Sequence, residues 1–518
     1  MRIVFYLFLL LLSVNCSKVH GQFTDRYWCF GDSAGIDFSN LSNPVPGHSI
    51  LRVRGTCASI CDSVGNLLFY AGSPDSLSWL TSGNDDYGYV INKSHQKMQN
   101  GERLKSLLWY QEMIIVPDPG NSERFYLFTI GVVSMPAGIF YSVIDLSYNN
   151  GLGKVTQKNI QLQSFEVGDG LAAVKHGNGR DWWVFMKPYS NTAALDAFYS
   201  YLISPSGVSG PFIQHIGSPV QYGSILRLKF TSNGSKLYAM SAGNLFESYD
   251  FDRCTGLLSN TNTIHISNVT PPYKKYWSFA LSPDASKLYA TSIELGANKE
   301  TSFLTQYDLN ASNVLASADT LQIFSRPTEA GLLQIGPDNK IYLSCVDYSP
   351  DCAWNYFYCD TSWSTTNSNI SVINSPDSLG AACNFQPFSF NLGGHRTYVG
   401  LPNNPNYELA KDSGSICDTL SVGLNELISN YSNLFVYYDA QWKIAFINAD
   451  KLTGSKYELK IYDISGREII QESGNLDSGA DGYRSFTRDM DMSGYTSGLY
   501  IISLTTEKEK LVRKFVKP

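Results

Sequence analysis

A β-hairpin pattern recurs about every fifty residues through most of this 518-residue chain. Its clearest copies surround Lys236, Lys287 and Lys340, where an apolar residue is followed by a polar turn, a lysine and an aromatic strand. Turn residues between β-rich runs predict hairpins. A repeat of this period is typical of β-propeller blades, because a four-stranded sheet cannot bury both faces alone and packs against its neighbours around an axis.

The spacing of the aromatic residues in this repeat predicts the number of blades. Successive anchors lie 51 to 57 residues apart. They are Phe69, Tyr126, Trp183, Tyr238, Tyr289, Tyr342 and Tyr398. We therefore expect an all-β ectodomain over residues 22–402, a β-propeller of about seven blades. Six or eight blades stay open, and two sandwiches built from unrelated hairpins are the alternative.

Composition agrees with an extracellular all-β protein. Aromatic residues make up 13% of the chain and charged residues only 16%, with 42 glycines for turns. The formal net charge of −7 argues against nucleic acid as a partner.

The first 21 residues have the pattern of a secretory signal peptide. Arg2 supplies the positive start, Ile3 to Leu12 are apolar, and Val19 and Gly21 suit cleavage before Gln22. Lipidation at Cys16 is the alternative, which Asn15 disfavours. The apolar run is too short to cross a bilayer and no later run is long enough, so we do not expect an integral membrane protein.

Residues 434–518 predict a second, small all-β module, an immunoglobulin-like β-sandwich. Strand-like runs occupy 434–438, 444–447, 457–462, 468–471 and 499–504. A short basic run then closes the chain. Residues 403–433 lack apolar periodicity and contain Asn403-Asn-Pro-Asn, so we expect a linker there.

This module resembles the type A C-terminal sorting domain of proteins exported by the type IX secretion system. Leu459 to Arg467 resembles the family strand "l-x-i-Y-D-x-x-G-r", Ser497 to Tyr500 resembles "s-G-x-Y", and Lys514-Phe-Val-Lys517 resembles the basic ending. The matching residues are Tyr462, Asp463, Gly466, Gly498, Tyr500, Lys514 and Lys517. The usual Pro-Asn-Pro opening is replaced here by Tyr437-Tyr-Asp-Ala440. A plain terminal sandwich with a lysine-bearing edge strand is the alternative.

The resemblance implies delivery to the cell surface or the medium across both membranes. It implies as partners the type IX secretion machinery and its sorting peptidase, which in the family removes the module before surface attachment or release.

The body resembles large propeller-type ectodomains that precede such sorting domains. Tyr27 to Phe38 and Gly55 to Tyr70 resemble their opening, Ile91 to Gly101 an inner segment, and Gly380 to Asn384 with Gly393 to Pro402 their closing segment. This resemblance implies architecture far more than chemistry.

Ten cysteines, one of them in the signal peptide, leave nine in the exported chain. In an oxidising compartment we expect disulfides, with at least one thiol left unpaired. The candidates are Cys57, Cys61, Cys345, Cys352, Cys359 and Cys383. A zinc site is the alternative, although no histidine pair accompanies Cys57 and Cys61.

The sequence carries no catalytic motif: no HExxH, GxSxG or P-loop pattern is present. We predict no cofactor and no metal site. Asp85 and Asp86 form one of the few acidic pairs and are expected in a solvated turn.

The strongest binding candidates are five aromatic residues in a short insertion. They are Trp354, Tyr356, Phe357, Tyr358 and Trp363, between or just after Cys352 and Cys359. Exposed aromatic faces bind sugar rings and apolar partners. Filling of the space between blades is the alternative role.

We therefore expect an ectodomain that acts in binding or adhesion toward a glycan or protein ligand. A secreted hydrolase of glycans or peptides is the second hypothesis, and a structural role at the cell surface is the third.

Overall fold

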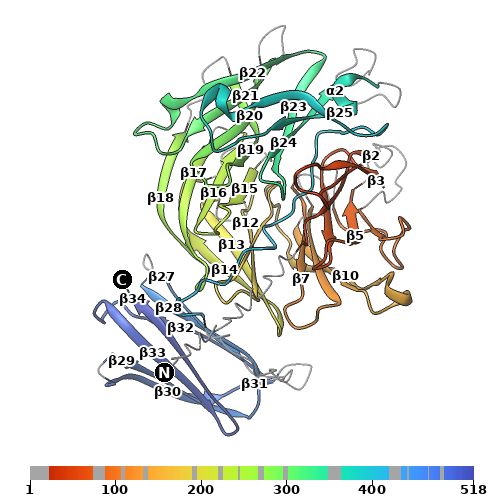
Figure 1. Cartoon of the computed structure of the whole chain (residues 1–518). Coiled ribbons are helices and arrows are strands. Elements are labelled where there is room, and N and C mark those ends of the chain that lie inside the picture. Colours follow the sequence, from red (N-terminus) through yellow and green to blue (C-terminus); the bar gives the residue numbers. More distant parts are fainter. Residues whose placement is uncertain are drawn as a thin grey trace, which may run out of the picture.

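The computed structural model describes residues 23–73, 88–106, 111–131, 138–189, 195–219, 226–242, 245–266, 273–295, 301–347, 363–418, 433–439, 443–464, 466–478 and 484–517. In these ranges almost all of the regular secondary structure is β-strand (Figure 1). The helical elements described are α2 (Thr365–Ser368) and the 3-10 turns η1 (Asn149–Gly151), η2 (Leu315–Ser317) and η3 (Gly380–Cys383). The predicted signal peptide lies outside the described residues.

The body contains seven successive antiparallel sheets in its described part, each with its strands in chain order. The first has β1 (Tyr27–Phe30), β2 (Asp32–Asp37) and β3 (Val45–Arg52), and the second has β4 (Cys57–Cys61), β5 (Leu67–Gly72) and β6 (Tyr89–Asn92). The third has β7 (Met113–Pro117), β8 (Arg124–Gly131), β9 (Gly138–Asp145) and β10 (Lys154–Gln163). The fourth has β11 (Ala172–Lys175), β12 (Trp182–Met186), β13 (Ala197–Ser204) and β14 (Gly207–His215).

Three further four-stranded sheets complete the body. The fifth has β15 (Leu226–Phe230), β16 (Lys236–Ser241), β17 (Leu245–Asp252) and β18 (Leu257–Ile266). The sixth has β19 (Tyr273–Leu281), β20 (Lys287–Leu295), β21 (Thr301–Asp308) and β22 (Asp319–Ser325). The seventh has β23 (Thr328–Ile335), β24 (Ile341–Asp347), β25 (Asn369–Ile373) and β26 (Phe385–Asn391).

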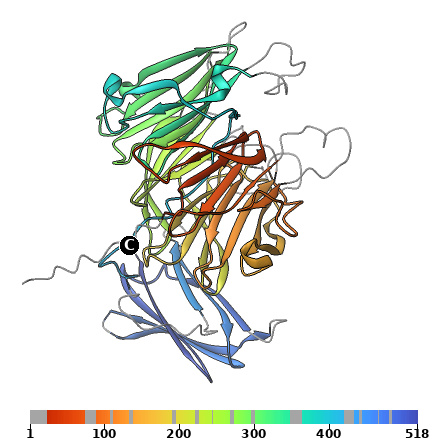
Figure 2. The ribbon, with the colours of Figure 1, turned by 45° about the vertical axis from the view of Figure 1, so that its right-hand side comes forward.

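Neighbouring sheets share hydrophobic clusters all the way round. One cluster joins the second, third and fourth sheets, and others join the fourth to the fifth, the fifth to the sixth and the sixth to the seventh. Tyr342 of the seventh sheet packs against Trp28 of the first sheet and against Phe38, which directly follows β2, with ring centroids 5.5 Å apart in both pairs. The sheets therefore close on themselves, and the body is propeller-like (Figures 1 and 2).

The repeated aromatic residues explain most of this arrangement. Six of the seven anchors lie buried in the second strand of the second to seventh sheets. The prediction for Tyr398 differs from the structure, since this residue follows the last sheet and lies in no strand. The remaining sheet is formed instead by residues 27–52, which do not carry the repeat.

The repeated lysine links the second and third strands of a sheet. Lys236 pairs with Asp250 and Lys287 with Asp308, directly across the antiparallel ladder, the second pair at 3.3 Å. Opposite charges facing each other across strands stabilise the pairing. Lys340 differs, because its nearest carboxylate is that of Asp338 in its own turn, at 4.0 Å.

Residues 396–412, here called the axial strap, cross the inner strands of the sheets. Strap residues 399 to 412 exchange hydrogen bonds with Leu332, Arg54, Cys57, Met113, Leu171, Ile115, Arg253 and Gly177. A Cβ atom on Gly400 would lie 1.6 Å from the Gly55 carbonyl oxygen, so only glycine fits this crossing. The first part of the segment expected to be a linker is therefore packed into the body.

A disulfide fastens the chain just after the strap. Cys417 bonds to Cys254, which follows β17, with the Cα atoms 5.5 Å apart. Residues 254 and 417 are 163 positions apart, and sequence reasoning did not single out this pair.

The predicted disulfide cysteines do not pair in the described residues. Cys57, Cys61, Cys345 and Cys383 are buried thiols, and Cys29 is a fifth. Cys57 and Cys61 begin and end one strand, and four residues of strand span about 13 Å, well beyond disulfide reach. Cys352 and Cys359 lie outside the described residues.

The C-terminal module has two four-stranded sheets. One has the order β27 (Asn433–Asp439), β28 (Ile444–Leu452), β32 (Arg484–Asp491), β31 (Asp477–Ser478). The other has the order β30 (Glu468–Asn475), β29 (Lys456–Asp463), β33 (Gly498–Thr506), β34 (Lys510–Lys517). Side chains of both sheets form one core that includes Ile447, Leu459 and Ile502. The basic run forms β34, an edge strand.

Candidate functional site

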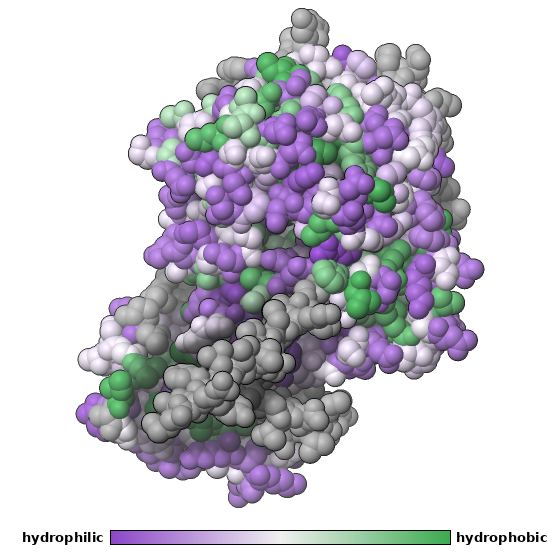
Figure 3. All heavy atoms as spheres, viewed as in Figure 1, coloured by the Kyte–Doolittle hydropathy of each residue, from purple (hydrophilic) through white to green (hydrophobic). Residues whose placement is uncertain are grey.

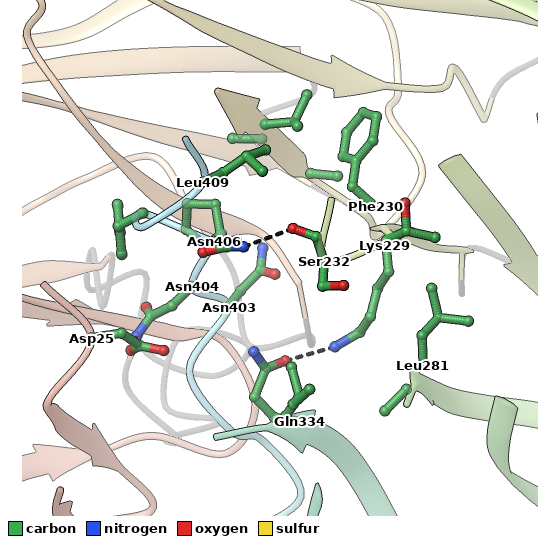
Figure 4. Close-up of a pocket in the computed structure, with 18 of the residues that line it drawn as sticks. Asp25, Lys229, Phe230, Ser232, Leu281, Gln334, Asn403, Asn404, Asn406 and Leu409 are labelled. Atoms are coloured by element: carbon green, nitrogen blue, oxygen red, sulfur yellow. Dashed lines mark hydrogen bonds between the residues drawn. The ribbon is translucent and has the colours of Figure 1, made fainter. Parts of the chain in front are cut away.

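A cavity of about 300 Å³ lies at the axis of the body, beside the strap (Figure 4). Its wall comes from the first strands of five sheets (β7, β11, β15, β19 and β23), from the turns after three of them, and from strap residues 403–409. The first strands of neighbouring sheets contact each other. In a closed ring of sheets these strands therefore lie around the axis. We call this space the axial cavity.

Lys229 of β15 brings an amine into the axial cavity. Its Nζ donates a hydrogen bond to Gln334 Oε1 at 2.6 Å (Figure 4). It donates a second one to the Leu333 carbonyl oxygen at 3.3 Å. Both acceptors are neutral, and no carboxylate among the described residues lies within ion-pair distance. Burial, reinforced by the nearby Arg227 cation, lowers the pKa of Lys229 to about 7.

Arg227 has a charge partner of its own. Its guanidinium group is buried and bonds Asp169, with 3.1 Å between Arg227 Nη1 and Asp169 Oδ2. Alternate residues of a strand share one face, so Arg227 and Lys229 lie on the same side of β15. The Asp169 carboxylate is therefore paired with Arg227, which lies two residues before Lys229 in β15.

Asp25 contributes a carboxyl group on the strap side of the axial cavity (Figure 4). Its Oδ1 accepts hydrogen bonds from Asn404 Nδ2 at 2.5 Å and from Trp28 Nε1 at 2.9 Å. Burial raises the pKa of Asp25 to about 7, against the opposing effect of these two donors. Both an acid and an amine in this cavity therefore titrate near neutral pH.

Asparagine side chains of the strap hold it against the inner strands. Asn403 Nδ2 donates to the carbonyl oxygens of Met113 and Leu171, both at 3.0 Å, and Asn406 Nδ2 donates to that of Ser232 at 2.8 Å. With its Nδ2 engaged, Asn403 turns its Oδ1 toward the cavity (Figure 4). The Asn403-Asn-Pro-Asn segment is therefore a cavity wall rather than free loop.

Glu408 places a second carboxyl group at the rim of the axial cavity. Burial of part of this group raises its pKa, while Arg26 and Lys175 act in the opposite direction. Lys175 is itself held by the strap, since its Nζ donates to the Tyr407 carbonyl oxygen at 2.6 Å.

Sequence reasoning missed this cavity, although the repeat contains a signal for it. When the turns after the first strands are aligned, Lys229, Ala280 and Gln334 occupy the same position, one residue before the last apolar residue of the strand. All three line the axial cavity. Polar residues at an inward position of a repeat are a usable indicator of a site.

The predicted aromatic binding residues are described only in part. Trp354, Tyr356, Phe357 and Tyr358 lie outside the described residues, as do Asp85 and Asp86. Trp363 is 53% exposed, and the Arg396 guanidinium carbon lies 4.9 Å from the centre of its ring. Trp363 thus presents an accessible aromatic surface next to the start of the strap.

Asp463 and Gly466 of the predicted sorting motif form a turn. Asp463 Oδ1 accepts a hydrogen bond from the Arg467 backbone N–H at 3.1 Å, and Gly466 has a φ of +83°. Gly466 also bonds back to the Asp463 carbonyl oxygen. Tyr462 directly follows Ile461, the last buried residue of the alternating strand β29, and leads into this turn.

The rest of the motif joins the last two strands of the module. Tyr500 packs against Phe515 of β34 with ring centroids 5.3 Å apart, and Gly498 pairs with Lys517 across the ladder. Lys517 Nζ donates to the Tyr495 carbonyl oxygen, whereas Lys514 points to solvent. Of these two lysines, Lys514 is the one that is accessible.

The described residues contain no group of three or more His, Cys, Asp or Glu side chains placed to hold a metal ion. None of the helices in the described ranges has the length and hydrophobicity needed to cross a bilayer.

Known structures resemble the body only distantly. The Cps50 (Swd1) β-propeller domain of Myceliophteria thermophila gives a TM-score of 0.34 at 10% identity, over 62% of this chain and 92% of that one. The periplasmic gluconolactonase PpgL of Pseudomonas aeruginosa gives a TM-score of 0.42 at 12% identity, over 71% of this chain and 94% of that one. The α-L-arabinofuranosidase PaAbf62A of Podospora anserina gives a TM-score of 0.28 at 10% identity, over 50% of this chain and 88% of that one.

The propeller-like character of the body is carried by its own sheet order and shared clusters, since these TM-scores lie below 0.5. No curated protein matches the chain. Residues 442–518 match the family model of the secretion system C-terminal sorting domain. Behind its propeller-like body, the chain therefore carries a type IX secretion C-terminal sorting domain, and it is exported to the cell surface or secreted.

Proposed function

We propose that this exported protein is a binding module of the cell surface or medium, with the axial cavity as a ligand site. The observation that carries the proposal is the construction of that cavity. Strands from five sheets and the strap converge on one space that holds an amine and several amide groups. Concave sites with a few placed polar groups are the usual form of small-ligand sites.

The finer architecture belongs to the same proposal. Residues 22–402 form a propeller of about seven blades. Residues 403–433 begin with the last part of the strap and then connect to the C-terminal module. Residues 434–518 form an immunoglobulin-like sandwich that the secretion machinery and its sorting peptidase recognise. The seven closing sheets and the two-sheet core of the module support this view. Residues 1–21 act as the signal peptide that delivers the chain to the periplasm.

A second candidate function is hydrolysis of a glycan or peptide. It is favoured by one observation: Asp25 and Lys229 line the same cavity and both have a pKa of about 7. Groups that titrate near the working pH serve as general acids and bases. Adhesion through the exposed Trp363 and the neighbouring aromatic insertion is a further form of the binding function.

Binding and turnover can be separated on one set of substrates. The full-length exported protein is applied to glycan and peptide arrays, retention is measured by fluorescence, and products are measured by mass spectrometry. We expect retention without turnover. Turnover that disappears in Asp25→Asn establishes the hydrolase instead, and absence of both retention and turnover contradicts the binding function.

The predicted aromatic site has its own control in this assay. A Trp354→Ala/Tyr356→Ala variant is expected to lose retention of a large ligand if the insertion is the platform. Unchanged retention in that variant, with loss in Lys229→Met, assigns the ligand to the axial cavity.

A further inference from the structure

We propose that the axial cavity binds a small hydroxylated carboxylate of the sugar-acid class, with its carboxylate at Lys229 and Gln334 and its hydroxyl groups toward the strap. The inference rests on the proposed binding function and names the ligand chemistry that this site fits.

The amine end of the cavity is built for an anion. An ammonium group has three donors, and Lys229 uses two of them on Gln334 and the Leu333 carbonyl oxygen. Gln334 accepts with its Oε1, so its Nε2 donor group turns toward the strap side of the cavity (Figure 4). A carboxylate has two oxygens, and Lys229 and Gln334 present one donor for each.

The opposite wall offers mainly hydrogen-bond acceptors. Asn403 Nδ2 is engaged on two backbone carbonyls, which leaves Asn403 Oδ1 facing the space, and Asn404 Nδ2 donates to Asp25. Asp25 uses one carboxyl oxygen for its two donors, which leaves the other oxygen for a ligand hydroxyl. Acceptors of this kind bind hydroxyl groups and disfavour a second anionic group on the same ligand.

The volume of the cavity also limits the ligand. At about 300 Å³ it lies at the lower end of small-molecule sites, which suits one sugar-sized unit. Leu281 and Ile335 supply apolar wall between the polar ends. A free sugar acid and the end of a uronate chain share this chemistry, and the probes below distinguish them.

Binding of a carboxylate is expected to depend on pH. The ligand adds a negative charge beside Lys229, which favours the ammonium form, so binding takes up protons near neutral pH. The other charged groups at the site are Asp25 and Glu408, which line the cavity, and Arg227, whose cation acts on Lys229 from nearby. Asp25 loses its proton as the pH rises through about 7 and then repels the ligand, so it reinforces the same trend.

Titration calorimetry on the full-length protein tests the proposal. The probes are galacturonate, galactose and a short oligogalacturonide, at pH 6 and pH 8.5. We expect galacturonate to bind at least about tenfold more tightly than galactose and more weakly at pH 8.5 than at pH 6. Binding of the oligomer as tight as that of the monomer points to a chain end as the natural source, and weaker binding points to the free acid.

Two cavity variants and one matched control complete the design. Lys229→Met removes the amine, and Gln334→Glu places a competing carboxylate beside it; both are expected to reduce galacturonate affinity by at least about tenfold. Lys236→Met makes the same chemical change at an exposed ion pair outside the cavity and should bind like the wild type. Thermal melting confirms that each variant is folded.

Several outcomes overturn the inference. They are galactose binding as tight as galacturonate binding, full affinity in folded Gln334→Glu, and binding of none of the probes. The array retention described above is measured separately, so a protein that retains an array ligand but binds none of these probes keeps the binding function and loses only the sugar-acid assignment.

Discussion

At the scale of single residues, the repeated lysine lies in two different environments, one exposed and one buried. Lys287 is mostly buried beside Asp308 and also donates to Ser286 Oγ at 3.1 Å, whereas Lys236 and Asp250 are both exposed to solvent. We expect Lys287→Met to lower the free energy of unfolding by about 1–3 kcal/mol and Lys236→Met by less than about 1 kcal/mol. Urea titrations measure both, and equal losses would contradict the role of burial.

Asp25 predicts a pH dependence of stability. Its pKa in the folded protein is about 7, above the ordinary value of 3.8, so the folded state binds more protons than the unfolded state between these values. The stabilising contribution of the protonated form is therefore present below about pH 4 and is lost as the pH rises through 7.

Asp25→Asn removes this titration. Thermal melting of both proteins from pH 4 to pH 8 should show the wild type losing stability relative to the variant across that interval. A constant difference between the two curves would show that the Asp25 pKa is not raised.

The strand position and burial of a residue could be predicted where the residue belongs to the repeat, and not elsewhere. The buried positions of Tyr238 and Tyr289 follow from hairpin chemistry in the local sequence. The contact between Asp25 and Asn404 does not, because Asn404 is 379 positions away in the chain and meets Asp25 only through closure of the body. The same holds for the Cys254–Cys417 disulfide.

At the scale of elements, the strap is the part that sequence patterns could not reveal. It has no strand periodicity because it bonds to a different sheet at nearly every step. Hairpins, by contrast, pair neighbouring residues and so leave a local pattern. The closing sheet was missed for a related reason, since β1 to β3 share no repeat with the others and the position of Tyr398 suggested a blade at the wrong end.

A substitution of Gly400 tests whether the strap packs against the Gly55 backbone. A methyl group at this position meets the Gly55 backbone, which cannot move without displacing β4. We expect Gly400→Ala to destabilise the protein by more than about 2 kcal/mol. Gly494→Ala is the matched control, because nothing lies within 4 Å of a Cβ atom there. Similar melting temperatures for the two variants would place the strap elsewhere.

The Cys254–Cys417 disulfide holds the far end of the strap. Its long loop restricts the unfolded chain, so its removal is expected to cost about 2–5 kcal/mol. The Cys254→Ser/Cys417→Ser variant should melt at a lower temperature and exchange the strap amide hydrogens faster, as measured by hydrogen exchange. Faster exchange should centre on Asp412, whose N–H bonds to Gly177. Unchanged protection there would show that hydrogen bonds alone hold the strap.

At the scale of the whole molecule, the two parts differ in how they are stabilised. The body needs all its sheets, since the first packs against the last and the strap crosses several. The C-terminal module has a core of its own, formed only by residues from 434 onward. A separate core is what permits a domain to fold independently of its neighbours.

This independence predicts that the module carries the export information by itself. In a host with the type IX pathway, a reporter joined to residues 1–21 and 430–518 should reach the cell surface or the medium, as measured by fractionation and surface protease accessibility. A periplasmic reporter would contradict the prediction.

Asp463→Ala, which removes the acceptor that holds the 463–467 turn, should reduce export. Asp489→Ala serves as the control, because it changes an aspartate of the same module that lies on β32, outside the sorting motif. Export lost equally in both variants would mean that general stability of the module, and not the motif turn, is what the machinery requires.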